Sequence, residues 1–92
     1  RDLRLSSLYE LGKFETALSL IDSYKHFIKK DQNYTAKMKQ GYLLFLTYIN
    51  DLIRLKLGLP RKNAAEVKEK LASSLPMRKD WLIKKFDEIA ER

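Results

Sequence analysis

Residues 35–57, TAKMKQGYLLFLTYINDLIRLKL, predict the longest helix of the chain and the centre of its fold. Apolar side chains recur in this stretch at spacings of four and three: Met38, Tyr42, Phe45, Ile49 and Leu52. This is the period of a helix that buries one stripe of side chains. Both flanks of the stripe are also apolar, with Leu44, Tyr48 and Leu55 on one and Leu46, Ile53 and Leu57 on the other. We therefore expect a central helix that contacts more than one neighbour.

The segment before the central helix, LYELGKFETAL at residues 8–18, predicts a turn between two helices. Gly12 tolerates the left-handed conformation that closes a helix, so it ends a helix over residues 3–11 and lets the next one begin. Asn33 or Thr35 is placed to cap the central helix that follows. Because the link at Gly12 is only two residues long, the first two helices are expected to lie antiparallel as an αα-hairpin.

The segment after the central helix predicts a fourth helix. Gly58 and Pro60 end the central helix, because glycine closes it and proline cannot continue it. Asn63 then supplies an N-cap, and Glu66 three residues later completes a pair of the capping-box type. We expect this helix over about residues 64–73.

A fifth helix is predicted at the end of the chain. Ser73 and Pro76 break the fourth helix, and the following apolar side would consist of Trp81, Leu82, Ile83, Phe86 and Ile89. This pattern favours a helix over about residues 77–90. No β pattern occurs, so residues 1–92 are predicted to form a single all-α domain of about five helices.

Residues 11–17, LGKFETA, together with Ile21, resemble the turn and second helix of a tetratricopeptide repeat. In that family a glycine ends the first helix, an aromatic residue two positions later packs between the helices, and a small residue permits close approach. Gly12, Phe14 and Ala17 match these roles, and Ile21 occupies the place of a bulky apolar residue. The resemblance implies a right-handed superhelix of antiparallel helices that binds a protein or peptide.

A repeat of about 34 residues should be visible in a regular array, yet a shift of that length places Leu46 where Gly12 should be. We therefore expect the first hairpin to be the last, degenerate repeat of a longer array, which the later helices cap. The chain opens at Arg1 without Met, so residues 1–92 are interpreted as the C-terminal part of a larger helical-repeat protein. An irregular helical bundle is the alternative architecture.

The composition limits the classes of function. The chain has 45% apolar and 34% charged residues and no cysteine, which is typical of a folded domain without disulfides or thiol chemistry. Its longest apolar stretch, residues 41–49, is too short to span a membrane. The net charge of +7 could attract an acidic partner. The basic excess is spread, however, with eight basic and five acidic residues in 1–46 and eleven and seven in 47–92.

No catalytic, metal or cofactor site is predicted. Ser19, Asp22 and His26 would stand in a row on one helix, whereas a catalytic triad needs its base between the other two groups. The chain has a single histidine, and its three glycines are too far apart for a phosphate-binding loop. We expect Gly41 to allow close packing against another helix. The chain is therefore predicted not to be an enzyme and to need no cofactor.

Two surfaces are candidates for binding. The apolar flank Leu44, Tyr48 and Leu55 is either covered by helices of the same domain or receives an amphipathic segment, from another protein or from a second copy of the chain. A basic cluster near the end of the central helix, which could meet an anion, comprises Arg54, Lys56, Arg61 and Lys62. A second basic cluster comprises Lys25, Lys29, Lys30, Lys37 and Lys39.

The leading hypothesis is a non-enzymatic protein–protein interaction or scaffold module of the tetratricopeptide-like type. The alternative is a basic helical domain that binds nucleic acid. Cations close to the C-terminal ends of helices also complement the helix dipole, so the basic clusters do not require a ligand.

Overall fold

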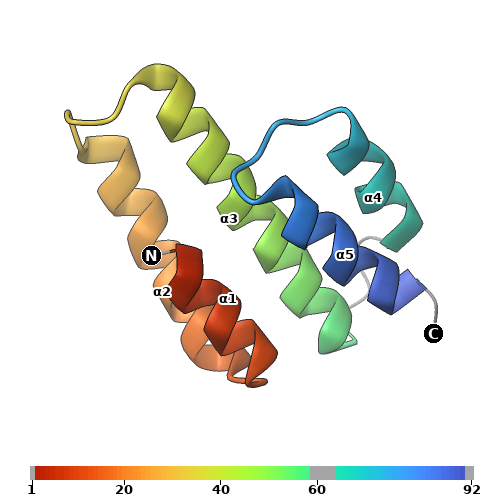
Figure 1. The fold of residues 1–92 in the computed structure, drawn as a ribbon. Helices are drawn as coiled ribbons and strands as arrows, with labels where there is room; N and C mark the ends of the chain where they lie inside the picture. Colours follow the sequence, from red (N-terminus) through yellow and green to blue (C-terminus); the bar gives the residue numbers. More distant parts are fainter. Residues whose placement is uncertain (1, 59–63, 91–92) are drawn as a thin grey trace.

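The computed structural model describes residues 2–58 and 64–90, and within these residues it contains five helices and no strand (Figure 1). The helices are α1 (Asp2–Glu10), α2 (Phe14–Lys30), α3 (Ala36–Lys56), α4 (Ala64–Ala72) and α5 (Lys79–Ala90). The predictions of an all-α fold and of five helices are confirmed. None of the described helices is both long enough and apolar enough to cross a membrane.

The α1–α2 hairpin forms as its glycine predicts. Gly12 has a φ of +74°, and two hydrogen bonds close α1 behind it: Gly12 N–H donates to the Tyr9 carbonyl at 3.0 Å and Lys13 N–H to the Leu8 carbonyl at 2.9 Å. This pair of bonds is a Schellman motif. The Phe14 ring then contacts the Tyr9 ring, with centroids 5.8 Å apart. The turn thus folds α2 back along α1 (Figure 1).

The central helix α3 packs against α2, α4 and α5, as its three apolar sides predict. It begins at Thr35, whose hydroxyl accepts a hydrogen bond of 3.1 Å from Met38 N–H, so Thr35 is the cap of the two that were considered. Seven of its side chains are buried: Tyr42, Phe45, Leu46, Tyr48, Ile49, Leu52 and Ile53. Met38, which the pattern places in the buried stripe, is half exposed, because the first turns of α3 extend beyond α5 (Figure 1).

The end of α3 and the start of α5 are set by residues with positive φ angles. Gly58 closes α3 with a φ of +72° and a 3.2 Å hydrogen bond to the Leu55 carbonyl. The predicted breaker Pro60 and cap Asn63 lie outside the described residues. The predicted start of the fifth helix at residue 77 is wrong by two residues, because Arg78 has a φ of +55° and a helix cannot pass through that conformation.

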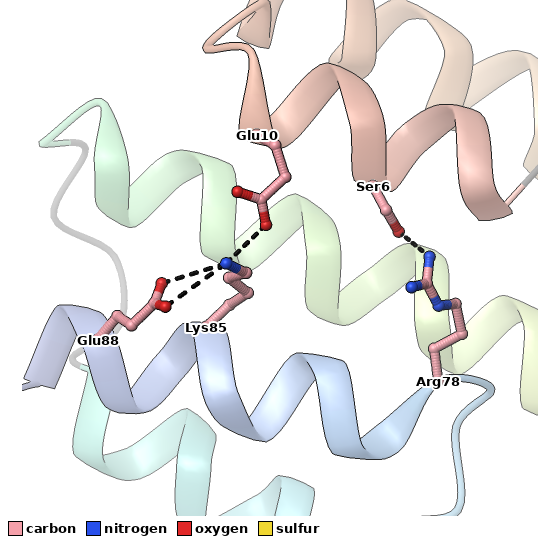
Figure 2. Close-up of polar contacts among 5 residues, drawn as sticks. All are labelled: Ser6, Glu10, Arg78, Lys85 and Glu88. Carbon is pink, nitrogen blue, oxygen red and sulfur yellow. Dashed lines mark hydrogen bonds and ion pairs between the residues drawn. The ribbon is translucent and has the colours of Figure 1, made fainter.

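The first and last helices contact each other and close the bundle. The Arg78 guanidinium donates a hydrogen bond to the Ser6 hydroxyl, and Lys85 Nζ lies 2.6 Å from Glu10 Oε1 (Figure 2). Since residue numbers rise together along this contact, α1 and α5 run parallel; in Figure 1, α1 lies in front of α2 and α5 in front of α3. An open superhelix would let each repeat contact only its neighbours. Of the two architectures that the sequence left open, the contact between α1 and α5 therefore favours the irregular helical bundle over the open superhelix.

The bundle has the dimensions of an ordinary small domain. Its radius of gyration is 12.8 Å, close to the value of about 12 Å expected for a compact chain of this length. The core runs along α3 and takes side chains from all five helices. Its largest fully buried members are Phe45 of α3 and Phe86 of α5.

Candidate functional site

The first half of α3 carries a groove on the side that faces away from the core. Two hollows of about 400 Å³ each lie side by side there and share Gln40 and Leu44. The first hollow is lined by Ala36, Lys39, Gln40, Leu43, Leu44 and Thr47. The second is lined by Lys37, Gln40, Gly41, Leu44, Ser73, Ser74 and Leu75. We call these residues together the Leu44 groove.

The wall of the groove opposite α3 is the segment between α4 and α5, and three hydrogen bonds hold it in place. Ser74 Oγ donates to the Lys70 carbonyl at 2.8 Å. The Tyr48 hydroxyl lies 2.7 Å from Ser74 Oγ, and since that serine's proton points to Lys70, the tyrosine is the donor. Met77 N–H donates to the Gly41 carbonyl at 3.0 Å. The wall is therefore fixed to α3 at both of its ends.

Gly41 allows this wall to approach α3. A Cβ atom built at Gly41 would lie 3.6 Å from the Leu75 carbonyl oxygen and 3.6 Å from Met77 Cγ, which is ordinary van der Waals contact. Close packing at this glycine is confirmed, but the prediction that it faces another helix is wrong. The neighbour is the α4–α5 connection, which Pro76 keeps out of both helices.

The groove is apolar at its centre and basic at its edges. Leu75 is 78% exposed on the wall, and Leu43 and Leu44 are half-buried on α3. Lys39 lines the first hollow and Lys37 the second, so the leucines lie between two cations. Among the described residues, neither hollow is lined by an aspartate or a glutamate.

A third hollow, of about 420 Å³, adjoins the groove at Ser73 and has the opposite charge. It is lined by Glu66, Glu69, Lys70 and Ser73 on the outer side of α4. The basic part of the surface therefore stops at the α4–α5 connection, and beyond it the surface turns acidic.

The structure brings one of the three predicted partner-binding residues to the groove. Leu44 lies at its centre, between the two hollows. Tyr48 is only 6% exposed and has its hydroxyl bonded to Ser74, and Leu55 is half-buried against the core about two helix turns beyond it. The pattern of the flank did not indicate Leu43 or Leu75, because Leu75 belongs to a connection that the helical period does not describe.

The predicted anion-binding residues do not form a site that the described residues define. Arg54 and Lys56 are half-buried in the last turn of α3, where they complement the helix dipole. Arg61 and Lys62 lie outside the described residues. Ser19, Asp22 and His26 are all exposed on α2. The described residues contain no group of three or more His, Cys, Asp or Glu side chains that could hold a metal ion.

The contact between α1 and α5 contains an ion pair with a nearly buried lysine, and the sequence analysis did not foresee it. Lys85 is 8% exposed, and its ammonium group lies 2.6 Å from Glu10 and 3.4 Å from Glu88 (Figure 2). The hydrogen bond to Glu10 raises the pKa of Lys85, and the same bond lowers the pKa of Glu10. Because both charged forms are stabilised, the pair holds the two helices together and offers no proton for catalysis.

Aromatic rings complete this contact, which we call the α1–α5 seam and define by Ser6, Tyr9, Glu10, Arg78, Trp81 and Lys85. The Trp81 ring meets the Tyr9 ring edge to face at 5.7 Å. Arg78 Cζ and Lys85 Nζ lie 5.3 Å and 5.9 Å from the centroid of the same indole. These are distances at which a cation is attracted to an aromatic face. The charged groups of the seam, Glu10, Arg78 and Lys85, therefore all have partners within the chain.

Comparisons of the chain with protein families, with curated proteins and with solved structures find no match. The Leu44 groove is thus the feature from which a function can be inferred.

Proposed function

We propose that this chain is a non-enzymatic protein-interaction module that receives a segment of a partner protein in the Leu44 groove. The observation that carries the proposal is the pair of hollows that meet at Leu44. The first lies on α3 alone, and the second lies between α3 and the α4–α5 connection. Grooves of this kind accept the apolar side of an amphipathic helix.

The rigidity of the groove supports this role. Its floor belongs to α3, the helix that contributes more buried side chains to the core than any other described helix. Its wall is hydrogen-bonded to α3 through Ser74 and Met77. A preformed surface loses little conformational entropy when a partner binds. The exposed Leu75 gains from being covered, because about 25 cal/mol is released for each Å² of apolar surface removed from water.

The tetratricopeptide-like hairpin is a second argument for an interaction role. Gly12, Phe14, Ala17 and Ile21 occupy a turn, a ring contact and two buried positions that correspond to their roles in that family. We propose on this basis that the α1–α2 hairpin is related to a tetratricopeptide repeat. Further hairpins with the same glycine and aromatic spacing in any longer sequence that contains residues 1–92 would support it, and an unrelated neighbouring domain would refute it.

The experiment for the binding role is a selection of helical peptides from a display library against the 92-residue chain. Peptides that bind the original chain should bind the Leu44→Glu variant at least tenfold more weakly. They should bind Leu11→Glu as they bind the original chain, because Leu11 is equally apolar, 69% exposed and far from the groove. Circular dichroism checks that both variants are folded. Selected peptides that are insensitive to Leu44→Glu would refute the proposal.

The second candidate is binding to nucleic acid, favoured by the net charge of +7 and by basic residues in the last turns of α2 and α3. Such binding would weaken steeply with salt, since each neutralised phosphate releases counterions. Titration with an oligonucleotide at two salt concentrations tests it. Binding that is absent at low salt eliminates this candidate.

A further inference from the structure

We propose that the partner of the Leu44 groove is an acidic amphipathic helix of another protein. It would lie along the first half of α3 with its apolar side on Leu43, Leu44 and Leu75 and its carboxylates over Lys37 and Lys39. This inference rests on the proposed function and adds the chemistry of the partner to it.

The charges at the edges of the groove carry the argument. Lys37 and Lys39 belong to opposite hollows, so cations stand on both sides of the shared leucine. The first turn of α3 contains no acidic residue, and the positive end of the α3 dipole lies there as well. A helix with glutamates flanking an apolar stripe therefore complements this surface on both sides, whereas a basic helix would be repelled from both.

The length of the groove sets the length of the partner. Residues 36–47 of α3 rise by about 16 Å, or about three helix turns. A helix of about 12 to 14 residues laid along this stretch presents three or four apolar side chains to the groove.

The acidic hollow on α4 limits the direction of the partner. Glu66 and Glu69 line it together with Lys70, which leaves a net charge of −1 directly beyond Ser73 at the end of the groove. An acidic helix that crossed the connection onto α4 would bring its carboxylates against these two. The partner axis therefore follows α3 and does not cross to α4.

The experiment uses two designed peptides of about 14 residues that share one apolar stripe of leucines. One has glutamate and the other lysine at every flanking position. Each is titrated into the isotopically labelled 92-residue chain while its amide signals are followed by NMR. The glutamate peptide should shift the signals of residues 36–47 and 73–75 and bind at least tenfold more tightly than the lysine peptide.

Charge reversal at the groove provides the matched variants. Lys37→Glu and Lys39→Glu should each lower the affinity of the chain for the glutamate peptide by about threefold or more. Lys13→Glu makes the same change in net charge at the α1–α2 turn, at the opposite end of the molecule (Figure 1), and should leave its affinity unchanged. A scrambled peptide of the same composition, without an apolar stripe, should not shift the groove signals.

The remaining outcomes separate the two proposals. If both peptides bind the groove equally, the groove is a docking site, but the acidic partner is refuted. If neither peptide shifts residues 36–47, both proposals fail. If an oligonucleotide shifts these signals and the glutamate peptide does not, or if the chain dimerises through this face in sedimentation, the acidic helix is again refuted.

Discussion

The α1–α5 seam and the Leu44 groove contain the same kinds of side chain, apolar groups beside lysines or arginines. Only in the seam are the apolar groups covered and the cations paired with partners from the same chain. In the seam, Lys85 is bonded to Glu10, and the Trp81 ring is covered by Tyr9 and two cations. In the groove, Leu75 is exposed, and within residues 2–58 and 64–90 no carboxylate lines the two hollows beside Lys37 and Lys39. The seam therefore shows which groups a partner would have to bring to the groove: apolar surface and carboxylates.

The largest test of this difference is the loss of one side chain from each region. Trp81→Ala should lower the free energy of unfolding by about 3 kcal/mol, because the indole contacts rings of α1 and α3. Leu44→Ala should lower it by about 1 kcal/mol or less, because half-buried groove residues support little of the core. Urea unfolding of both variants measures the difference. Equal losses would show that the groove belongs to the structural core.

The next test separates a buried charge from its exposed partner. Glu10→Ala should cost about 1 kcal/mol, because it leaves the Lys85 ammonium buried with only the more distant Glu88. Lys85→Met should cost less, because it keeps the apolar stem beside Trp81 and leaves a half-exposed carboxylate that water can solvate. Urea unfolding again provides the values. A larger loss for Lys85→Met would mean that the pair stabilises the seam beyond its desolvation cost.

Arg78 combines a strained backbone with two contacts in the seam. Arg78→Ala and Arg78→Gly both remove the hydrogen bond to Ser6 and the contact with Trp81, but only glycine adopts a φ of +55° without a steric penalty. Arg78→Gly should therefore be more stable than Arg78→Ala by about 1 kcal/mol, measured by thermal unfolding at matched conditions. Equal stabilities would show that the turn relaxes when the side chain is lost.

In the groove, Gly41→Ala should raise stability by about 0.5 to 1 kcal/mol. Alanine favours the helix over glycine, and its Cβ would make ordinary contacts of 3.6 Å with the wall. The same methyl group enters the second hollow, so binding of the glutamate peptide should weaken slightly. Thermal unfolding and the NMR titration measure the two effects. A loss of stability would mean that the wall lies closer to α3 than these contact distances indicate.

The smallest expected effect is the pH dependence of the seam. The lowered pKa of Glu10 gives stability that is present above its unfolded value of 4.5 and is lost as pH falls through the folded value. The raised pKa of Lys85 gives stability that is present below 10.5 and is lost as pH rises through the folded value. Each change should be below about 1 kcal/mol, because Glu10 is half exposed to solvent. Glu10→Gln should flatten the acid limb of stability against pH; an unchanged limb would contradict this assignment.

Local signals in the sequence predicted the helices well because short-range geometry decides them. Gly12 and Thr35 act through hydrogen bonds to residues within five positions, and the period of α3 reports its buried stripe directly. The start of α5 was less predictable, because the left-handed conformation of Arg78 depends on contacts with α1. No local spacing relates residue 78 to residue 6.

The candidate site was only partly predictable for the same reason. Leu44 was found because an apolar residue on the flank of a helix needs a cover, but the pattern does not say which element provides it. Tyr48 is covered by the α4–α5 connection, whose Ser74 binds its hydroxyl. Leu75 lies exposed in that connection, beyond the end of α4, where the helical period says nothing of its position. Lys85 stands four residues after Trp81, on the same face of α5, and this spacing was the one signal that could have indicated its burial.

The parallel contact between α1 and α5 also sets the order in which the molecule can be completed during translation. α1 meets α5 only when residues 79–90 have emerged, about 4 to 16 seconds after α1 itself at ordinary rates of synthesis. Until then the Tyr9 ring and the future neighbours of Trp81 face water. A nascent chain stalled inside α5 would therefore expose the apolar surface around Tyr9. This is the stage at which a chaperone would have the most apolar surface to cover.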